Sequence, residues 1–204
     1  MAVSASPALA APVNAGHLQA ELVAQDTAVA PGATIVVALR QKIEPGWHTY
    51  WRNPGDSGQA TTLTWALPDG WRASDLVWPT PQRMMTGPLM DYGYTGEVLL
   101  PVTLTAPASA RPGQTVTLKA QAAFLVCKDV CVPADASLSL DLPVAAAAGE
   151  RDPAWGTKIA LTLADAPRPG GLKAAMTVSG QLIRLSVTGP AATDAGRDQA
   201  YFFP

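Results

Sequence analysis

Proline and glycine recur along the whole chain and divide it into short segments, and this limits the possible folds more than any other feature. The 204 residues include 19 prolines and 17 glycines, and turn signals such as Pro31-Gly32 and Pro112-Gly113 separate the segments. The segments are rich in Val, Leu and Thr, and several alternate apolar and polar residues, as a strand with one buried face does. Many short strands joined by such turns predict an all-β sandwich. The expected strands cover residues 17–25, 33–42, 61–67, 97–105, 115–126 and 132–142.

The composition supplies material for a core and excludes several classes of protein. Hydrophobic residues make up 48% of the chain and charged residues 15%, so the chain is not expected to be disordered. The formal net charge is -2 and there is no basic cluster, which argues against nucleic acid as a partner. No uninterrupted apolar run reaches about 18 residues, so no segment is expected to span a bilayer as a helix.

A change of composition after Pro143 divides the chain, because a run of alanines is followed there by Gly, charged residues and Pro. We expect a short helix over 154–164 and, beyond it, two strands at 173–178 and 181–187 that flank the hairpin turn Ser179-Gly180. The expected organisation is a disordered remnant of an exported protein's N-terminus at 1–15, a sandwich domain at 16–145, a linker at 146–153 and the truncated start of a second β-domain at 154–204.

The two cysteines, Cys127 and Cys131, stand four residues apart, and three interpretations compete. A structural disulfide closing so short a loop adds only about 2 kcal/mol, against about 4 or more for a loop near a hundred residues. A zinc site usually needs four ligands, and only His17 and His48 are available as histidines. The third interpretation is a redox pair, in which a nearby second thiol resolves a mixed disulfide. The residues alone leave the structural and the redox disulfide open.

The sequence around the cysteines favours a β-hairpin over a helix, since valines and Pro133 surround the pair. With Lys128-Asp129-Val130 at the tip, the two cysteines face each other across the hairpin. Directly opposed strand residues lie about 4.5–5.5 Å apart at Cα, which is within the range of a disulfide.

Four separated motifs carry more information than the cysteines alone. They are the segment at residues 46–58 (GWHTYWRNPGDSG), the segment at 78–81 (WPTP), the segment at 91–97 (DYGYTGE) and the cysteine hairpin that ends in Val132-Pro133. In this order they resemble the N-terminal periplasmic (alpha) domain of DsbD-type thiol–disulfide interchange proteins, and within that family the ScsB branch, which is associated with copper tolerance. The resemblance covers about residues 17–145 and is weaker after 150.

This resemblance implies an immunoglobulin-like sandwich in the periplasm that needs no metal or organic cofactor. Electrons would arrive through the membrane-embedded and thioredoxin-like domains of the same full-length protein. They would leave to a soluble periplasmic thioredoxin-fold protein, either ScsC-like or a disulfide isomerase. In the family the second cysteine attacks the partner, which here implies attack by Cys131 and resolution by Cys127.

The sequence departs from the DsbD pattern in two places. The interval between the cysteines is shorter here than in DsbD. In DsbD a loop with an aromatic residue shields the cysteines, and the matching loop of this sequence lacks that aromatic residue, whose place falls near Asp91. Methionine is flexible and packs well against sulfur, so a methionine-rich loop is expected to shield the pair instead. The expected cap residues are Met84, Met85, Leu89, Met90, Asp91 and Tyr92.

Two aromatic residues are candidate supports of the site. By the same resemblance, His48 and Tyr50 align with two tyrosines that approach the cysteines, and they would position or polarise the thiols, His48 being able to move a proton near neutral pH. The alternative is that both residues belong to the sandwich core. The alternative for the whole chain is a non-catalytic sandwich with a structural disulfide that binds a protein, or binds Cu(I) through the methionine thioethers.

Overall fold

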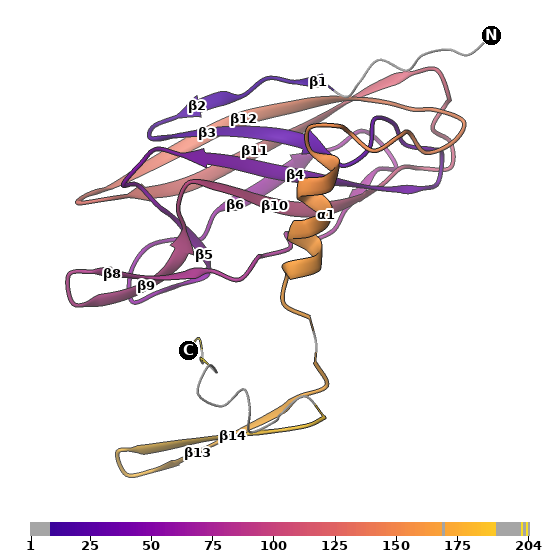
Figure 1. Ribbon diagram of the computed structural model, residues 1–204. Coiled ribbons are helices and arrows are strands. Elements are labelled where there is room, and N and C mark those ends of the chain that lie inside the picture. The colour runs from indigo at the N-terminus through magenta and orange to yellow at the C-terminus, as the bar shows by residue number, and fades with distance from the viewer. Residues whose placement is uncertain (1–8, 169, 191–200, 202, 204) are drawn as a thin grey trace. The chain divides into compact units, whose positions relative to one another are not determined.

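A computed structural model describes residues 9–168, 170–190, 201 and 203. Two antiparallel sheets form an immunoglobulin-like sandwich in the part of the chain before Pro167 (Figure 1). The first sheet has the order β1 (Leu9–Ala10), β12 (Cys131–Pro143), β11 (Thr115–Cys127) and β6 (Thr62–Ala66). The second sheet has the order β2 (Val13–Ala15), β3 (Leu18–Ala24), β4 (Thr34–Ile43), β10 (Glu97–Thr105) and β7 (Arg72–Ala73). A smaller sheet has the order β5 (Thr49–Gly55), β9 (Leu89–Tyr94) and β8 (Gln82–Thr86).

The core lies between the two large sheets and follows the two-residue period of the strands. In β11 every second residue from Leu118 to Val126 is buried, and the same holds in β12 from Ala136 to Leu142. The second sheet supplies Leu22, Leu39 and other inward residues from β3, β4 and β10. All six strands expected from the sequence are confirmed to within one residue at each end.

The helix α1 (Gly156–Asp165) explains why β4 and β10 are buried on both faces. Ile159 of the helix is fully buried and packs with Ala38 of β4, Leu99 of β10 and Val23 of β3. The turn before the helix is held by the Asp152 carboxylate, which accepts hydrogen bonds from the next N–H groups of the turn at 2.9 Å. The helix ends before Pro167, which disfavours helical geometry at the preceding residue.

This packing moves the division of the chain away from the place that the sequence suggests. The contacts divide the chain after Ala166, not at the expected linker 146–153, because α1 belongs to the sandwich through Ile159. At the N-terminus, part of the segment 1–15 that was expected to be disordered has regular structure. β1 pairs with β12 and β2 pairs with β3, so residues 9–10 and 13–15 are strands, and residues 1–8 lie outside the described part.

The described residues of the second unit include a hairpin of β13 (Lys173–Ser179) and β14 (Leu182–Thr188), as the sequence predicts. Ser179 pairs with Leu182, so the two turn residues are Gly180 and Gln181, one position later than expected. Met176 and Val178 lie on one face of the hairpin together with apolar residues of β14, and the residues of both strands are exposed.

Candidate disulfide site

Cys127 and Cys131 form a disulfide at the end of the long β11–β12 hairpin. Cys127 is the last residue of β11, Cys131 is the first of β12, and the two are register partners with their Cα atoms 4.1 Å apart. The tip consists of the three residues between them, where the Lys128 N–H donates to the Val130 carbonyl at 3.1 Å. The hairpin with its three-residue tip is therefore as the sequence suggests.

The two sulfur-bearing residues differ sharply in their access to solvent. Cys127 is 1% exposed, whereas Cys131 is exposed, and Val130 beside it at the tip is 64% exposed. Of the two residues in this disulfide, Cys131 is therefore the one that an approaching protein can reach.

The chain just before and within β5 lies beside the disulfide. His48 and Cys127 exchange two backbone hydrogen bonds of 2.9 Å, which makes His48 the neighbour of Cys127 on the side away from β12. Paired residues and residues two apart on a strand share a face, so this pairing places His48, Tyr50 and both cysteines on one face. The Tyr50 hydroxyl lies 3.7 Å from the Cys131 Sγ and 3.2 Å from the His48 Nε2.

Burial controls the protonation of these two supporting residues. Desolvation lowers the pKa of His48 below its ordinary range, and the nearby charge of Asp91 opposes this by raising it. Desolvation raises the pKa of Tyr50, Asp91 raises it further, and a hydrogen bond from the Ser57 side chain opposes the increase. His48 is therefore neutral at pH 7 and Tyr50 is a neutral phenol.

The expected cap residues lie on the β8–β9 hairpin and fall into two groups. Met85 and Leu89 flank its tip and are 62% and 38% exposed, and Met84 and Met90 are half-buried. Asp91 and Tyr92 are buried in β9, and the Asp91 carboxylate is bound by Ser57. Shielding of the disulfide by the methionines stays a prediction, whereas the buried Asp91 carboxylate is bound by the half-buried Ser57.

Ser57 is the residue at this site to which the sequence reasoning gave no role. It lies in the Gly-Asp-Ser-Gly run that follows Pro54, which is the end of the motif at residues 46–58. Its N–H and hydroxyl both donate to the Asp91 carboxylate, 34 residues later in the chain. Only the polar, glycine-flanked run pointed to a tight turn, and no local pattern pointed to its partner.

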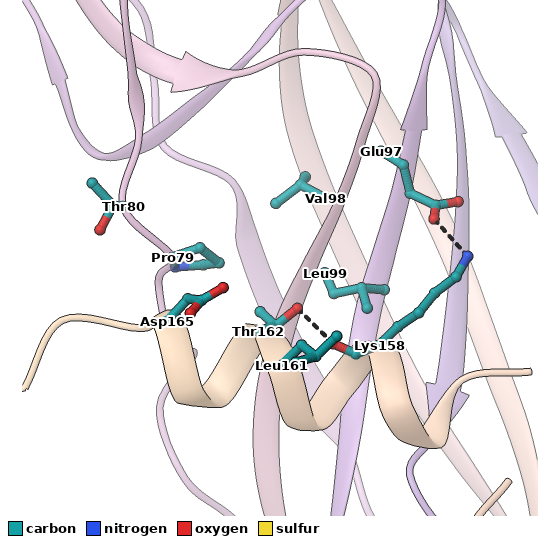
Figure 2. A pocket seen from close by; sticks show the side chains of 9 residues that line it. All are labelled: Pro79, Thr80, Glu97, Val98, Leu99, Lys158, Leu161, Thr162 and Asp165. Carbon is teal, nitrogen blue, oxygen red and sulfur yellow. Dashed lines mark hydrogen bonds and ion pairs between the residues drawn. The ribbon is translucent and has the colours of Figure 1, made fainter.

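A separate groove of about 530 Å³ lies between α1 and the start of β10 (Figure 2). The Lys158 ammonium bonds the Glu97 carboxylate at 3.1 Å across it, and Leu161 adds an apolar side chain that is 59% exposed. No cysteine, histidine or tyrosine lines this groove, so it is not the disulfide site. Within the described residues there is also no cluster of three or more His, Cys, Asp or Glu side chains that is suited to a metal ion.

Together the fold and the site define an immunoglobulin-like domain with a half-exposed disulfide on a hairpin. Comparison with known proteins agrees with this class. Residues 19–143 match the family model described as thiol:disulfide interchange protein DsbD, N-terminal, and the chain belongs to this family.

One solved structure is similar over most of the chain. It is the N-terminal periplasmic domain of ScsB from Proteus mirabilis, with a TM-score of 0.61 and 25% identity, and the match covers 84% of this chain. The chain spans 64% of the length of that solved domain. A comparison with curated proteins gave no match. Among the described residues, no helix is long and apolar enough to cross a membrane.

Proposed function

We propose that this chain is a periplasmic protein-disulfide reductase module that passes reducing equivalents to soluble thioredoxin-fold proteins, either ScsC-like proteins or disulfide isomerases. Its own electrons come from thioredoxin-like and membrane-embedded domains of the same full-length protein. The domain itself uses no cofactor beyond its cysteine pair. Its membership of the DsbD N-terminal family and its similarity to a periplasmic ScsB domain support this proposal.

The observation that carries the proposal is the unequal burial of the two cysteines. A disulfide that only holds a loop together has no need of an exposed sulfur, whereas exchange requires one sulfur that a partner reaches and a second that is kept apart. The residues fit this division, since Cys131 is an exposed residue and Cys127 is 1% exposed, with 4.1 Å between their Cα atoms. The exposed Val130 beside Cys131 adds apolar surface for the partner to contact.

Exchange proceeds in two displacements that together move two electrons. In the reduced domain, the thiolate of Cys131 attacks one sulfur of the partner's disulfide. This attack forms a mixed disulfide and releases the partner's other sulfur as a thiolate, which takes up a proton. The thiolate of Cys127 then attacks Cys131 Sγ, forms the internal disulfide and releases the partner's second sulfur. The partner is reduced to a dithiol and this domain is oxidised.

Electron transfer to an oxidised disulfide isomerase tests the proposal with two matched variants. The reduced chain is mixed with the isomerase, and thiol status is followed by alkylation and gel shift. Cys131→Ser is expected to abolish transfer, whereas Cys127→Ser is expected to accumulate the mixed disulfide because the resolving thiol is missing. Transfer by both variants at the wild-type rate would refute the proposal.

A measured reduction potential separates this function from a purely structural disulfide. Structural disulfides have potentials below about -300 mV, and exchange-active ones lie higher. We expect the Cys127–Cys131 pair to lie above that value in equilibrium with glutathione or thioredoxin buffers. A lower potential, together with no transfer to the isomerase, would favour the non-catalytic binding module.

A further inference from the structure

The hydrogen-bond pattern of the β11–β12 hairpin decides where the backbone groups of Cys131 point. The N–H and the C=O of Cys127 are both bonded to His48, at 2.9 Å each, so neither is directed at Cys131. The Lys128 N–H donates to the Val130 carbonyl, so the hairpin's hydrogen bonds lie beside the cysteine pair and not within it. The Cα separation of 4.1 Å agrees with such a pair, for which about 4.5 Å is usual. The N–H and the C=O of Cys131 therefore point away from β11.

The side to which these groups point is an open edge of the sheet in the described part of the chain. β1 pairs with β12 only at Leu140 and Asp141, and no hydrogen bond to the N–H or C=O of Cys131 is present among the described residues. The far end of β12 supports the direction. Pro143 lies an even number of residues further on, and its carbonyl accepts from the Val29 N–H on this same outer side at 3.1 Å. An unpaired donor and an unpaired acceptor thus lie beside the exposed Cys131 side chain.

This open edge is short. The next residue of β12 with its backbone directed outward is Pro133, and proline has no N–H. Further along, the N-terminal part of the sandwich lies beside the strand. β2 contacts β12 there, and a Cβ added at Gly16 would lie 3.6 Å from the Cβ of Ala134. An extended segment that pairs with this edge therefore finds both a donor and an acceptor at one residue, Cys131.

We propose that an extended segment of the partner protein pairs with β12 at Cys131 through two backbone hydrogen bonds, and that Pro133 ends the pairing there. The inference rests on the proposed exchange function, because it names the surface on which the thioredoxin-fold partner docks. Exposed strand edges accept added strands, and a proline on the edge limits such pairing. Two bonds hold the partner's backbone next to the exposed sulfur, and the missing N–H prevents a longer ladder that would delay the partner's release.

Amide hydrogen exchange in a mixed disulfide tests the pairing. The thiolate of Cys131 in an isotopically labelled Cys127→Ser chain attacks dithiodipyridine, which leaves a pyridyl disulfide on Cys131 and releases one pyridinethiolate. The thiolate of a reduced disulfide isomerase, whose resolving cysteine is replaced by serine, then attacks Cys131 Sγ. This step joins the two proteins and releases the second pyridinethiolate. The same chain joined to mercaptoethanol is the reference adduct.

We expect the Cys131 N–H to exchange at least about tenfold more slowly in the isomerase adduct than in the mercaptoethanol adduct, as NMR measures residue by residue. The reason is that this N–H is then hydrogen-bonded to the partner and exchanges only when the pairing opens. Equal exchange rates of the Cys131 N–H in the two adducts overturn the inference.

Pro133→Ala tests the part that Pro133 has in ending the pairing. Pro133 is exposed, so the substitution removes no core contact, and it adds an N–H to the open edge. The new amide at position 133 should also exchange at least about tenfold more slowly in the isomerase adduct than in the reference adduct. An equal rate in both adducts overturns the role of Pro133, because it would show that the pairing ends at Cys131 without the proline.

Pro143→Ala is the matched control, because it adds an N–H to the outer side of the same strand far from the disulfide. We expect the amide at position 143 to exchange at the same rate in the two adducts, and the protection of the Cys131 N–H to stay as in the parent chain. Protection of position 143 by the isomerase equal to that of position 133 would overturn the inference, since it would reflect a general tightening of β12 and not pairing at Cys131.

Failure of the proposed function looks different, because the adduct is formed chemically and needs no electron transfer. A wild-type chain that transfers no electrons to the isomerase, while the adduct shows the expected protection, refutes the function and leaves the pairing in place. A chain that transfers electrons but shows no protection at Cys131 refutes the pairing alone.

Discussion

Replacement of Gly58 by alanine tests whether the contact between the 55–58 turn and Tyr50 is as tight as the structure has it. The backbone at Gly58 has a φ of +93°, which costs a residue with a Cβ about 1–2 kcal/mol. The new Cβ would also lie 2.2 Å from Cε1 of Tyr50, and relief of such overpacking costs about a further 1–3 kcal/mol. We expect Gly58→Ala to lower the free energy of unfolding by about 2–5 kcal/mol.

Gly113 supplies a control in which an added Cβ would cost only the backbone strain of a positive φ and no overpacking. Its φ is +89°, nearly that of Gly58, and a Cβ there would meet nothing within 4 Å. We therefore expect Gly113→Ala to cost only about 1–2 kcal/mol. Guanidinium unfolding of the oxidised proteins, followed by tryptophan fluorescence, measures both. Equal losses in the two variants would refute the contact, and with it the close packing of the turn on Tyr50.

Three further predictions concern the helix and the buried titratable groups. Ile159→Ala should cost about 2–4 kcal/mol because the side chain is fully buried, whereas Leu161→Ala, at 59% exposure, should cost under about 0.5 kcal/mol in the same denaturation assay. His48 should titrate by NMR below about 6.5, and lower still in Asp91→Asn, because burial depresses its pKa and Asp91 opposes this. Since the folded state then binds fewer protons than the unfolded one, this contribution to stability is present above about pH 6.5 and is lost as the pH falls through the folded pKa. Burial raises the pKa of Tyr94 in the folded state. The contribution of Tyr94 to the free energy of unfolding is therefore complete below about pH 10 and is lost as the pH rises above it. Between about pH 9 and 11, Tyr94→Phe should lose less stability than the wild-type protein does.

The regular strands of the sandwich could be predicted from the sequence because their residues follow a two-residue period over a buried face. The sheet β5-β9-β8 was not predicted. Its strands carry Asn53, Pro54 and Gly93, which read as loop residues, and β5 pairs with β9 through an irregular register between Tyr50 and Gly55. Such strands are fixed by their contacts and not by their own propensities.

The candidate site also has one part that the sequence predicts and another part that it does not. The cysteine pair is visible in the sequence because its two members are only four residues apart. The contact between Ser57 and Asp91 joins residues 34 positions apart, and no local sequence pattern predicts it. Likewise, the outward-facing Ala38 and Leu99 resemble ordinary strand residues until Ile159 is seen to cover them.

Strand order, and not the length of the tip, accounts for which cysteine is exposed. Cys127 lies on β11 between two neighbours, Cys131 of β12 on one side and His48 on the other. In the described part of the chain, β1 pairs with β12 only near Asp141, so Cys131 lies on a free edge. An insertion of two glycines after Asp129 should therefore leave Cys131 as the sulfur that reacts first with iodoacetamide in the reduced protein, although it changes how readily the loop closes. Faster labelling of Cys127 in that variant would contradict this argument, because it would show that the short tip, and not the sheet, keeps Cys127 buried.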